Sequence, residues 1–447
     1  MTTIASELTR ILDAKSALRA SLINKGADVP SGTPLEDYPA LVDALESGSA
    51  TPAWVRPDDW LTMPTISATD SKVAILAAVY SFGGNDFSFT ATGDFQVDWG
   101  DGTVETFSSG ATASHSYTYS THDVVGATIC SRGYKQALIV ITPQVGQVLT
   151  SFGTVEIIGA EIQPVLDLVI GSPNLSSFYI GSADGLGMCE HFSLVSVSNS
   201  FSSLRYAFAS MTRLQSIELC EMSGLNDMYG TFNGCTMLQT VPLIDTSNVI
   251  AFVGTFYNCT KLQEIPAFDT SKGEYFSYFA ANCQSLKVAP AIDTSLSTSL
   301  SGLFYNCASL SSVPDFDASN ATSIDYMFSR CFSLLALPAM DTSNVTNMHS
   351  AFEDCGMVVE IPGYDLSAVT TTDNAFSGMY SVRKFGATGI AVSFAIDYMY
   401  LSADSLNEIF TGLPTVTEGQ TISVGSTPGA ATCNSSIATA KGWTVYN

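Results

Sequence analysis

Residues 327–345 read MFSRCFSLLALPAMDTSNV, and the pattern in this stretch recurs along the chain every 24 residues. The consensus of the unit is Phe-x-x-Cys-x-x-Leu-x-x-Ile-Pro-x-Phe-Asp-Thr-Ser-Asn-Val. Cysteine and aspartate keep this step over six units, at Cys235, Cys259, Cys283, Cys307, Cys331 and Cys355 and at Asp245, Asp269, Asp293, Asp317, Asp341 and Asp365. Proline and leucine follow in register, so chance does not explain the period.

A fixed period of this length predicts a solenoid. Repeats of roughly 20–29 residues with Leu-x-x-Ile segments are typical of leucine-rich repeats, in which each unit forms one coil. Apolar residues then stack on their copies in neighbouring coils and build a continuous core. We expect Leu-x-x-Ile to form the strand of each coil and the proline to end it, because proline has no amide hydrogen. Asp-Thr-Ser-Asn is expected to form a turn.

The cysteine series has three interpretations. We favour buried free thiols, because Met211 and Met379 take the cysteine position in the atypical end units, which indicates an apolar slot. Disulfides between coils are the second, since stacked coils lie ~5 Å apart. A metal site is the third, but no histidine or Cys-x-x-Cys pair accompanies the series.

The aspartate series has two interpretations. We favour turn capping, since an aspartate carboxylate accepts hydrogen bonds from backbone amides two residues further on. A row of calcium sites is the alternative. One carboxylate per coil is too few for the oxygen coordination that calcium requires.

The repeats resemble a known family. The segments PLIDTSNV, PAMDTSNVTNM and MFSRCFSLLALP make residues 204–380 similar to the BspA-type leucine-rich repeats of bacterial surface proteins. Residues 147–203 look like degenerate units, and residues 381–447 look like the C-terminal cap of such an array. The resemblance implies adhesion or recognition through an extended surface.

A C-terminal cap is also expected on physical grounds, because the last coil would otherwise expose its core and an open sheet edge. Leu406, Ile409 and Phe410 lie on one face of a predicted helix. A strand around Ile422 and an apolar stretch around Trp443 complete the predicted cap.

Residues 66–146 are predicted to form a β-sandwich with a hairpin turn at Gly100-Asp-Gly102. The string VDWGDGT, with His115 and Tyr117 downstream, resembles the immunoglobulin-like polycystic-kidney-disease (PKD) module. In that family the modules act as spacers and binding domains. We expect Asp98 and Asp101 to form the turn in preference to a metal site, and His115 to pack in preference to catalysing a reaction.

Residues 1–46 are predicted to form a helical segment for attachment or oligomerisation. Ile4, Leu8, Ile11, Leu18 and Leu22 make the apolar seam of a short coiled coil, which Lys15 interrupts. A helix packed on its own domain is the alternative. Residues 47–65 follow as a linker.

Three strings stand out near the N-terminus: Ala14-Lys-x-x-Leu-x-x-x-Leu-Ile-x-Lys-Gly-Ala-x-Val29, Leu35-x-Asp-Tyr-Pro39 and Arg56-Pro-Asp-Asp-Trp60. They make residues 8–65 similar to the N-terminal segment of tailed-phage structural and fibre proteins. The resemblance implies attachment to other virion proteins. It also implies a homo-oligomer, for which the usual construction of fibres suggests a trimer. The protein is then made in the host cytoplasm and located in the virion.

Charge restricts the partners of this chain of 447 residues. Lys and Arg number 17 against 42 Asp and Glu, a net charge of -25, which argues against nucleic acid and anionic membranes. The aspartate of each coil supplies part of this negative sign. The N-terminus lacks the apolar core of a secretory signal, and no run approaches the ~20 apolar residues that span a membrane. We expect no membrane insertion.

A binding protein is favoured over an enzyme. The sequence contains no Gly-x-Ser-x-Gly, His-Glu-x-x-His or phosphate-loop motif, and we expect no catalytic residue, metal or cofactor. We expect a phage tail-fibre or receptor-binding protein whose solenoid recognises a glycan or protein on the host cell. The alternatives are a virion decoration or collar protein and a bacterial surface adhesin.

Tyrosines of the repeats that lie outside the predicted core are the candidate contact residues. Tyrosine suits recognition because it offers a large contact area and a polar group at low entropic cost. The alternative is that these side chains only pack between coils. The candidates are Tyr257, Tyr275, Tyr278, Tyr305 and Tyr326.

Overall fold

The computed structural model describes residues 54–81, 85–119, 129–154, 163–180, 186–417 and 419–447. The predicted N-terminal helix, its apolar seam and the first part of the linker lie outside these residues. The chain divides into two compact units, residues 1–58 and 59–447. The second unit confirms the predicted fold class: it is mainly β, and its described residues form a solenoid with two short helices.

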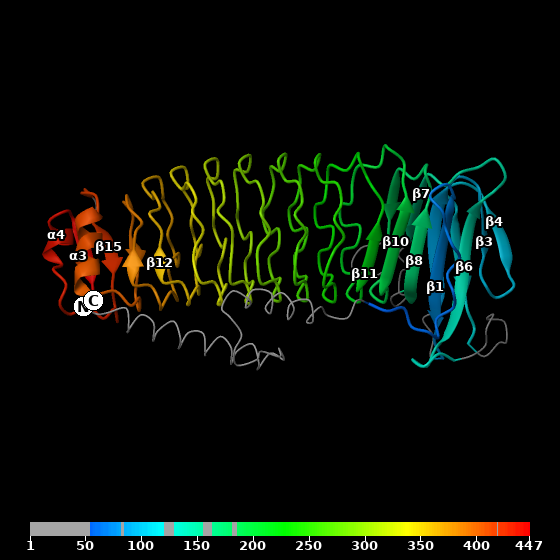
Figure 1. The fold of residues 1–447 in the computed structure, drawn as a ribbon, viewed down its shortest axis with the longest axis horizontal. Coiled ribbons are helices and arrows are strands. Elements are labelled where there is room, and N and C mark those ends of the chain that lie inside the picture. The colour runs from blue at the N-terminus through cyan, green and yellow to red at the C-terminus, as the bar shows by residue number, and fades with distance from the viewer. Residues whose placement is uncertain (1–53, 82–84, 120–128, 155–162, 181–185, 418) are drawn as a thin grey trace, which may run out of the picture. The chain divides into compact units, whose positions relative to one another are not determined.

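Two sheets form a sandwich that precedes the repeats (Figure 1). The larger has the order β11 (Ser216–Leu219), β10 (His191–Ser196), β8 (Val165–Gly171), β1 (Lys72–Val79), β6 (Lys135–Pro143), β3 (Phe95–Asp98) and β4 (Val104–Phe107). The smaller has the order β5 (Thr112–Ser116), β2 (Asp86–Thr92), β7 (Ser151–Thr154) and β9 (Ser177–Tyr179). Phe89 on β2 contacts Trp99, which follows β3, with ring centroids 5.5 Å apart. The two sheets therefore share a core.

The larger sheet continues from the sandwich into the repeats. β1 pairs antiparallel with β6 and with β8, whereas β10 pairs in parallel with β8 and with β11. The strand pairing thus changes from antiparallel to parallel at β8, where the coils begin. The sandwich therefore covers the first coil. The expected boundary at residue 146 lies between two strands of this one sheet.

Backbone hydrogen bonds join each coil to the next. The amide of Phe208 donates to the carbonyl of Thr231 at 2.9 Å, and the same bond recurs at equivalent residues along the array. Regular strands in the Leu-x-x-Ile segment occur only towards the ends, as β11 and as the pair β12 (Glu360–Ile361) and β13 (Lys384–Phe385). In the middle coils the predicted strand is reduced to isolated bonds. The proline that follows has no amide with which to extend the pairing.

Columns of identical side chains fill the solenoid. Phe232 and Phe256 stack with ring centroids 5.5 Å apart, and Phe304 and Phe328 stack at 6.0 Å. The six repeat cysteines are buried free thiols. Each thiol donates to a carbonyl of the preceding coil, as Cys307 Sγ does to the carbonyl of Ala280 at 3.1 Å. These columns merge with the sandwich core into one hydrophobic cluster.

The last coil is covered by a three-stranded sheet of β14 (Phe394–Ala395), β15 (Gln420–Ser423) and β16 (Trp443–Tyr446), with helices α3 (Ala403–Gly412) and α4 (Ser436–Thr439). The hydroxyl of Ser402 caps α3 by accepting the amide of Ser405 at 3.1 Å. The helix buries Leu406, Ile409 and Phe410, the three residues of its predicted apolar face. Within the described part of the chain, no helix has the length and apolar character needed to cross a membrane.

Candidate functional site

Two backbone positions of positive φ recur in the coils from residue 206 onward, and the first of them carries tyrosine in several coils. Its occupants in chain order are Tyr206, Gly230, Gly254, Tyr278, Gly302, Tyr326, Ser350, Asn374 and Tyr398. The left-handed conformation costs roughly 1–2 kcal/mol for a residue with a Cβ, and a bulky residue there is an outlier. The tyrosines therefore occupy a position that the backbone alone would leave to glycine. Strain of this kind often accompanies function.

Two of these tyrosines lie directly over a glycine of the next coil. A Cβ added to Gly302 would approach the ring of Tyr278 to 2.4 Å, and one added to Gly230 would approach the ring of Tyr206 to 2.4 Å. Only glycine leaves room for the ring at these places. The contact also restricts the direction of the ring.

Four of the five predicted tyrosines form one group, which we call the tyrosine cluster: Tyr257, Tyr278, Tyr305 and Tyr326. The rings of Tyr257 and Tyr278 meet edge to face with centroids 6.3 Å apart, and those of Tyr305 and Tyr326 do so at 5.9 Å. The amide of Tyr278 donates to the carbonyl of Ser301, whose hydroxyl donates to Asp325. Burial raises the pKa of Tyr278, and the charges of Asp325 and of the other three tyrosines raise it further. The cluster thus spans four successive coils.

Polar groups border the tyrosine cluster. The hydroxyls of Ser301 and Ser323 both donate to Oδ1 of Asp325. The hydroxyl of Tyr326 lies 2.8 Å from Nε2 of His349, whose ring stands edge to face with the tyrosine ring. The site therefore combines aromatic surface with a carboxylate and hydroxyl groups. This combination suits binding.

Tyr275, the fifth predicted residue, lies apart from these pairs. It occupies the bridge position between coils, paired with Ala251, and its side chain is 54% exposed. Tyr275 is therefore exposed enough to contact a partner, but it does not belong to either ring pair of the cluster.

Sequence reasoning missed further tyrosines on the same side of the solenoid. Tyr206 meets Tyr229 edge to face at 5.2 Å, and Tyr398 meets Tyr380 at 6.4 Å. The signal was present, because Tyr206 and Tyr398 fall in the 24-residue register of Tyr278. We call the whole row the tyrosine face: Tyr206, Tyr229, Tyr257, Tyr278, Tyr305, Tyr326 and Tyr398.

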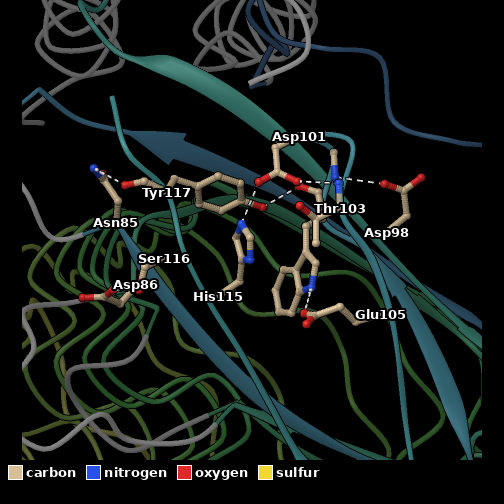
Figure 2. A network of polar contacts seen from close by, with 11 residues as sticks. Asn85, Asp86, Asp98, Asp101, Thr103, Glu105, His115, Ser116 and Tyr117 are labelled. Carbon is tan, nitrogen blue, oxygen red and sulfur yellow. Dashed lines mark hydrogen bonds and ion pairs between the residues drawn. The ribbon is translucent and has the colours of Figure 1, made fainter. Parts of the chain in front are cut away.

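A second polar group lies in the sandwich and holds its hairpin turn (Figure 2). Nε2 of His115 lies 2.7 Å from Oδ2 of Asp101, and the His115 ring stacks on Trp99 at 4.7 Å. The hydroxyl of Tyr117 donates to the carbonyl of Trp99 at 2.5 Å, and burial raises the pKa of that phenol. These contacts tie β5 to the turn after β3. The polar groups of His115, Asp101 and Tyr117 therefore take part in contacts within the sandwich.

The two aspartates of that turn are occupied by backbone amides. Oδ1 of Asp98 accepts the amide of Gly100 at 3.0 Å, and Oδ1 of Asp101 accepts that of Thr103 at 2.8 Å. No group of three or more potential metal-binding side chains occurs among the described residues.

The aspartate of each coil forms a turn of the same kind. Oδ1 of Asp317 accepts the amide of Ser319 at 3.0 Å, and the other five aspartates of the series do the same with the residue two positions on. The serine hydrogen bonds lower the pKa of Asp317. Burial, in contrast, raises the pKa of the Cys331 thiol to about 12, so the buried thiol stays protonated. Both series serve the architecture.

Comparison with known proteins identifies only the repeats. Residues 202–291 and 290–388 each match the family model described as "Mycoplasma protein of unknown function, DUF285". The match and the coils of 24 residues are compatible with a BspA-type repeat protein. No curated protein and no solved structure matches the chain.

Proposed function

We propose that the chain recognises a cell surface through its tyrosine face. The carrying observation is that bulky tyrosines hold left-handed backbone positions, at Tyr206, Tyr278, Tyr326 and Tyr398, while glycine holds the same position in intervening coils. Stacking of the coils does not require tyrosine there. An aromatic surface kept against backbone strain is well explained by a binding role.

The remaining parts of the chain are proposed to serve this role in a tailed-phage virion, as a tail fibre or receptor-binding protein. The proposal draws on the likeness of residues 8–65 to phage structural proteins and on the likeness of the sandwich to a PKD spacer. Residues 1–46 would attach the protein to other virion proteins and join copies into an oligomer. The solenoid would then meet the host surface.

Adsorption to cells tests the proposal. Fluorescently labelled full-length protein is incubated with a panel of bacterial strains, and bound protein is quantified beside the heat-unfolded chain as control. We expect folded protein to adsorb to a subset of strains and to protect that subset from infection by phage carrying the gene. Adsorption to none of the strains that this phage infects would contradict the proposal.

A bacterial surface adhesin is the second candidate, favoured by the match of residues 202–388 to a model described as a Mycoplasma protein. A decoration or collar protein of the virion would use the same repeats as a structural part. Immunogold labelling separates the three. Label at the tail tip supports receptor binding by a phage, label at the head or collar supports a structural part, and label on uninfected cells supports an adhesin.

A further inference from the structure

The tyrosine face already holds one cation, supplied by the chain itself. The guanidinium of Arg205 lies 4.0 Å from the ring centroid of Tyr229 and 5.6 Å from that of Tyr206. It also lies 3.8 Å from Oδ2 of Asp227. Two tyrosines and one carboxylate thus surround a guanidinium, which is the geometry of a cation–π site with a counter-ion.

The tyrosine cluster combines the same kinds of groups several coils further on, although the register positions of Tyr229 and Asp227 carry Ser301 and Ser299 there. Tyr278 corresponds to Tyr206, because each holds the left-handed position and lies over a glycine of the next coil. Tyr305 and Tyr326 supply further rings, and Asp325 supplies the carboxylate.

The cluster differs in having no arginine or lysine at the register position of Arg205. The five coils that follow residue 250 carry Val253, Ser277, Ser301, Asp325 and His349 there. The electrostatic surroundings agree with this difference. Burial raises the pKa of both phenols; the charge of Arg205 opposes that rise at Tyr206, whereas the carboxylate of Asp325 adds to it at Tyr278.

Hydrogen bonds position the carboxylate of Asp325. Both serine hydroxyls donate to the same oxygen, Oδ1, and these bonds hold the carboxylate in place. Within the described part of the chain, no hydrogen bond or ion pair engages its Oδ2. A cation with several N–H donors can stack on a tyrosine ring and pair with that oxygen at once.

We propose that the tyrosine cluster, with Asp325, binds an arginine side chain of a partner protein in the way that Tyr206, Tyr229 and Asp227 hold Arg205. This inference rests on the proposed recognition role and names the chemistry of its partner. A guanidinium is favoured because two tyrosines and a carboxylate of this chain already contact one at Arg205. A phosphate or carboxylate would instead meet the repulsion of Asp325.

Peptide binding to the full-length chain tests the proposal. The probe is a tri-arginine amide, measured by calorimetry at an ionic strength of about 0.15 M to screen the net negative charge. A tri-lysine amide and a glucosamine trimer serve as charged comparisons. We expect tri-arginine to bind severalfold more tightly than either, since arginine can both stack and pair.

Matched variants separate the cluster from general attraction. Tyr278→Ser with Tyr305→Ser should weaken tri-arginine binding roughly tenfold, whereas Tyr275→Ser, an exposed tyrosine of the same coil as Tyr278, should leave it unchanged. Asp325→Asn should weaken binding severalfold. Asp317→Asn removes the same charge outside the cluster and should have no effect, because asparagine also caps its turn.

Three outcomes would overturn the inference: no binding of tri-arginine, equal losses in the cluster and control variants, or binding of the glucosamine trimer alone. The result is independent of cell adsorption. Protein that adsorbs to cells through the cluster but ignores tri-arginine refutes only the arginine assignment. Protein that binds tri-arginine at the cluster but adsorbs to no cell refutes the proposed function and leaves this site standing.

Discussion

The interior phenylalanine column and the tyrosine face run through the same coils but differ in how uniform they are. The interior column repeats phenylalanine at Phe208, Phe232, Phe256, Phe304, Phe328, Phe352 and Phe376, with Ala280 as its exception. The left-handed position beside it alternates among tyrosine, glycine, serine and asparagine. The interior column must keep the same residue type, because the side chains of each coil pack directly on those of the next. The second position varies from coil to coil, with glycine beneath the rings of Tyr206 and Tyr278, and we propose that its tyrosines serve recognition.

Truncating the interior column should have the largest effect on stability. Phe304 is fully buried and stacks on Phe328 at 6.0 Å. Phe304→Ala should lower the free energy of unfolding by about 3–5 kcal/mol, because it leaves a cavity between coils. Urea unfolding followed by circular dichroism measures the change. Tyr275→Ser is the control, and its free energy of unfolding should stay within about 0.5 kcal/mol of the wild-type value. Equal losses in the two variants would contradict the proposed difference between the interior column and the exposed tyrosines.

A methyl group at Gly302 should disturb the tyrosine cluster itself. Gly302→Ala meets both the left-handed backbone and the ring of Tyr278 at 2.4 Å, and should cost roughly 2–4 kcal/mol. Gly254→Ala is the matched control, because its φ is also positive but its nearest neighbour is Cβ of Tyr257 at 3.7 Å. The difference between the two free energies of unfolding isolates the ring contact. If the two variants lose the same stability, Tyr278 does not lie over Gly302.

The cysteine column should behave as apolar filling. Cys307→Ala removes a buried sulfur and its bond to the carbonyl of Ala280, and should destabilise by about 1–3 kcal/mol. The thiols should also resist a thiol reagent until the chain unfolds, because burial raises the pKa of Cys307. Elemental analysis should show the same metal content before and after the substitution. A metal lost with the cysteine would mean that the column is a ligand set.

Removing strain from the tyrosine face should change the free energy of unfolding little while weakening tri-arginine binding. Tyr278→Gly relieves a left-handed tyrosine with φ of 56° but loses its ring contacts, so we expect a net change below about 1 kcal/mol. Unfolding and tri-arginine binding are measured on the same preparation. A large loss of stability would assign Tyr278 to packing, which is the alternative that the sequence left open.

Acid should weaken the turns of the coils, with the smallest expected effect for any one residue. Hydrogen bonds from serine lower the folded-state pKa of Asp245, Asp269, Asp317, Asp341 and Asp365. A depressed carboxyl pKa contributes stability above the unfolded value of about 4 and loses it as the pH falls through the folded value. Asp317→Asn should therefore flatten the fall in melting temperature below pH 4. An unchanged acid profile would argue against the capped turn.

Much of the solenoid could be predicted from the sequence because its order is local and repeated. The buried columns, the aspartate turns and the apolar face of α3 all follow from residue type at fixed spacing. Non-local pairing was harder to foresee. Nothing in the sequence shows that β8 pairs with β1 on one side and β10 on the other, or that the Leu-x-x-Ile segments shorten to isolated bonds.

The sequence predicted which tyrosines belong to the candidate site, but it did not predict their backbone conformation or their contacts. The tyrosines were visible as residues outside the core columns, and four of the five predicted ones meet in one cluster. The left-handed backbone of Tyr278 and Tyr326 and the glycine beneath Tyr278 were not visible, because a repeat pattern does not report the sign of φ. The role of Arg205 was missed although its ring partner, Tyr229, lies 24 residues on, at the same register position of the next coil.

Adsorption of two variants to the same cells tests the central claim most directly. Tyr278→Ser with Tyr305→Ser removes rings from the tyrosine cluster, and Tyr275→Ser removes an exposed ring beside it. Both proteins are first shown to unfold at the urea concentration of the wild type. We predict that the cluster variant loses adsorption to every strain that the wild type binds, while Tyr275→Ser adsorbs normally. Normal adsorption of a folded cluster variant would contradict the claim that the tyrosine face recognises the cell.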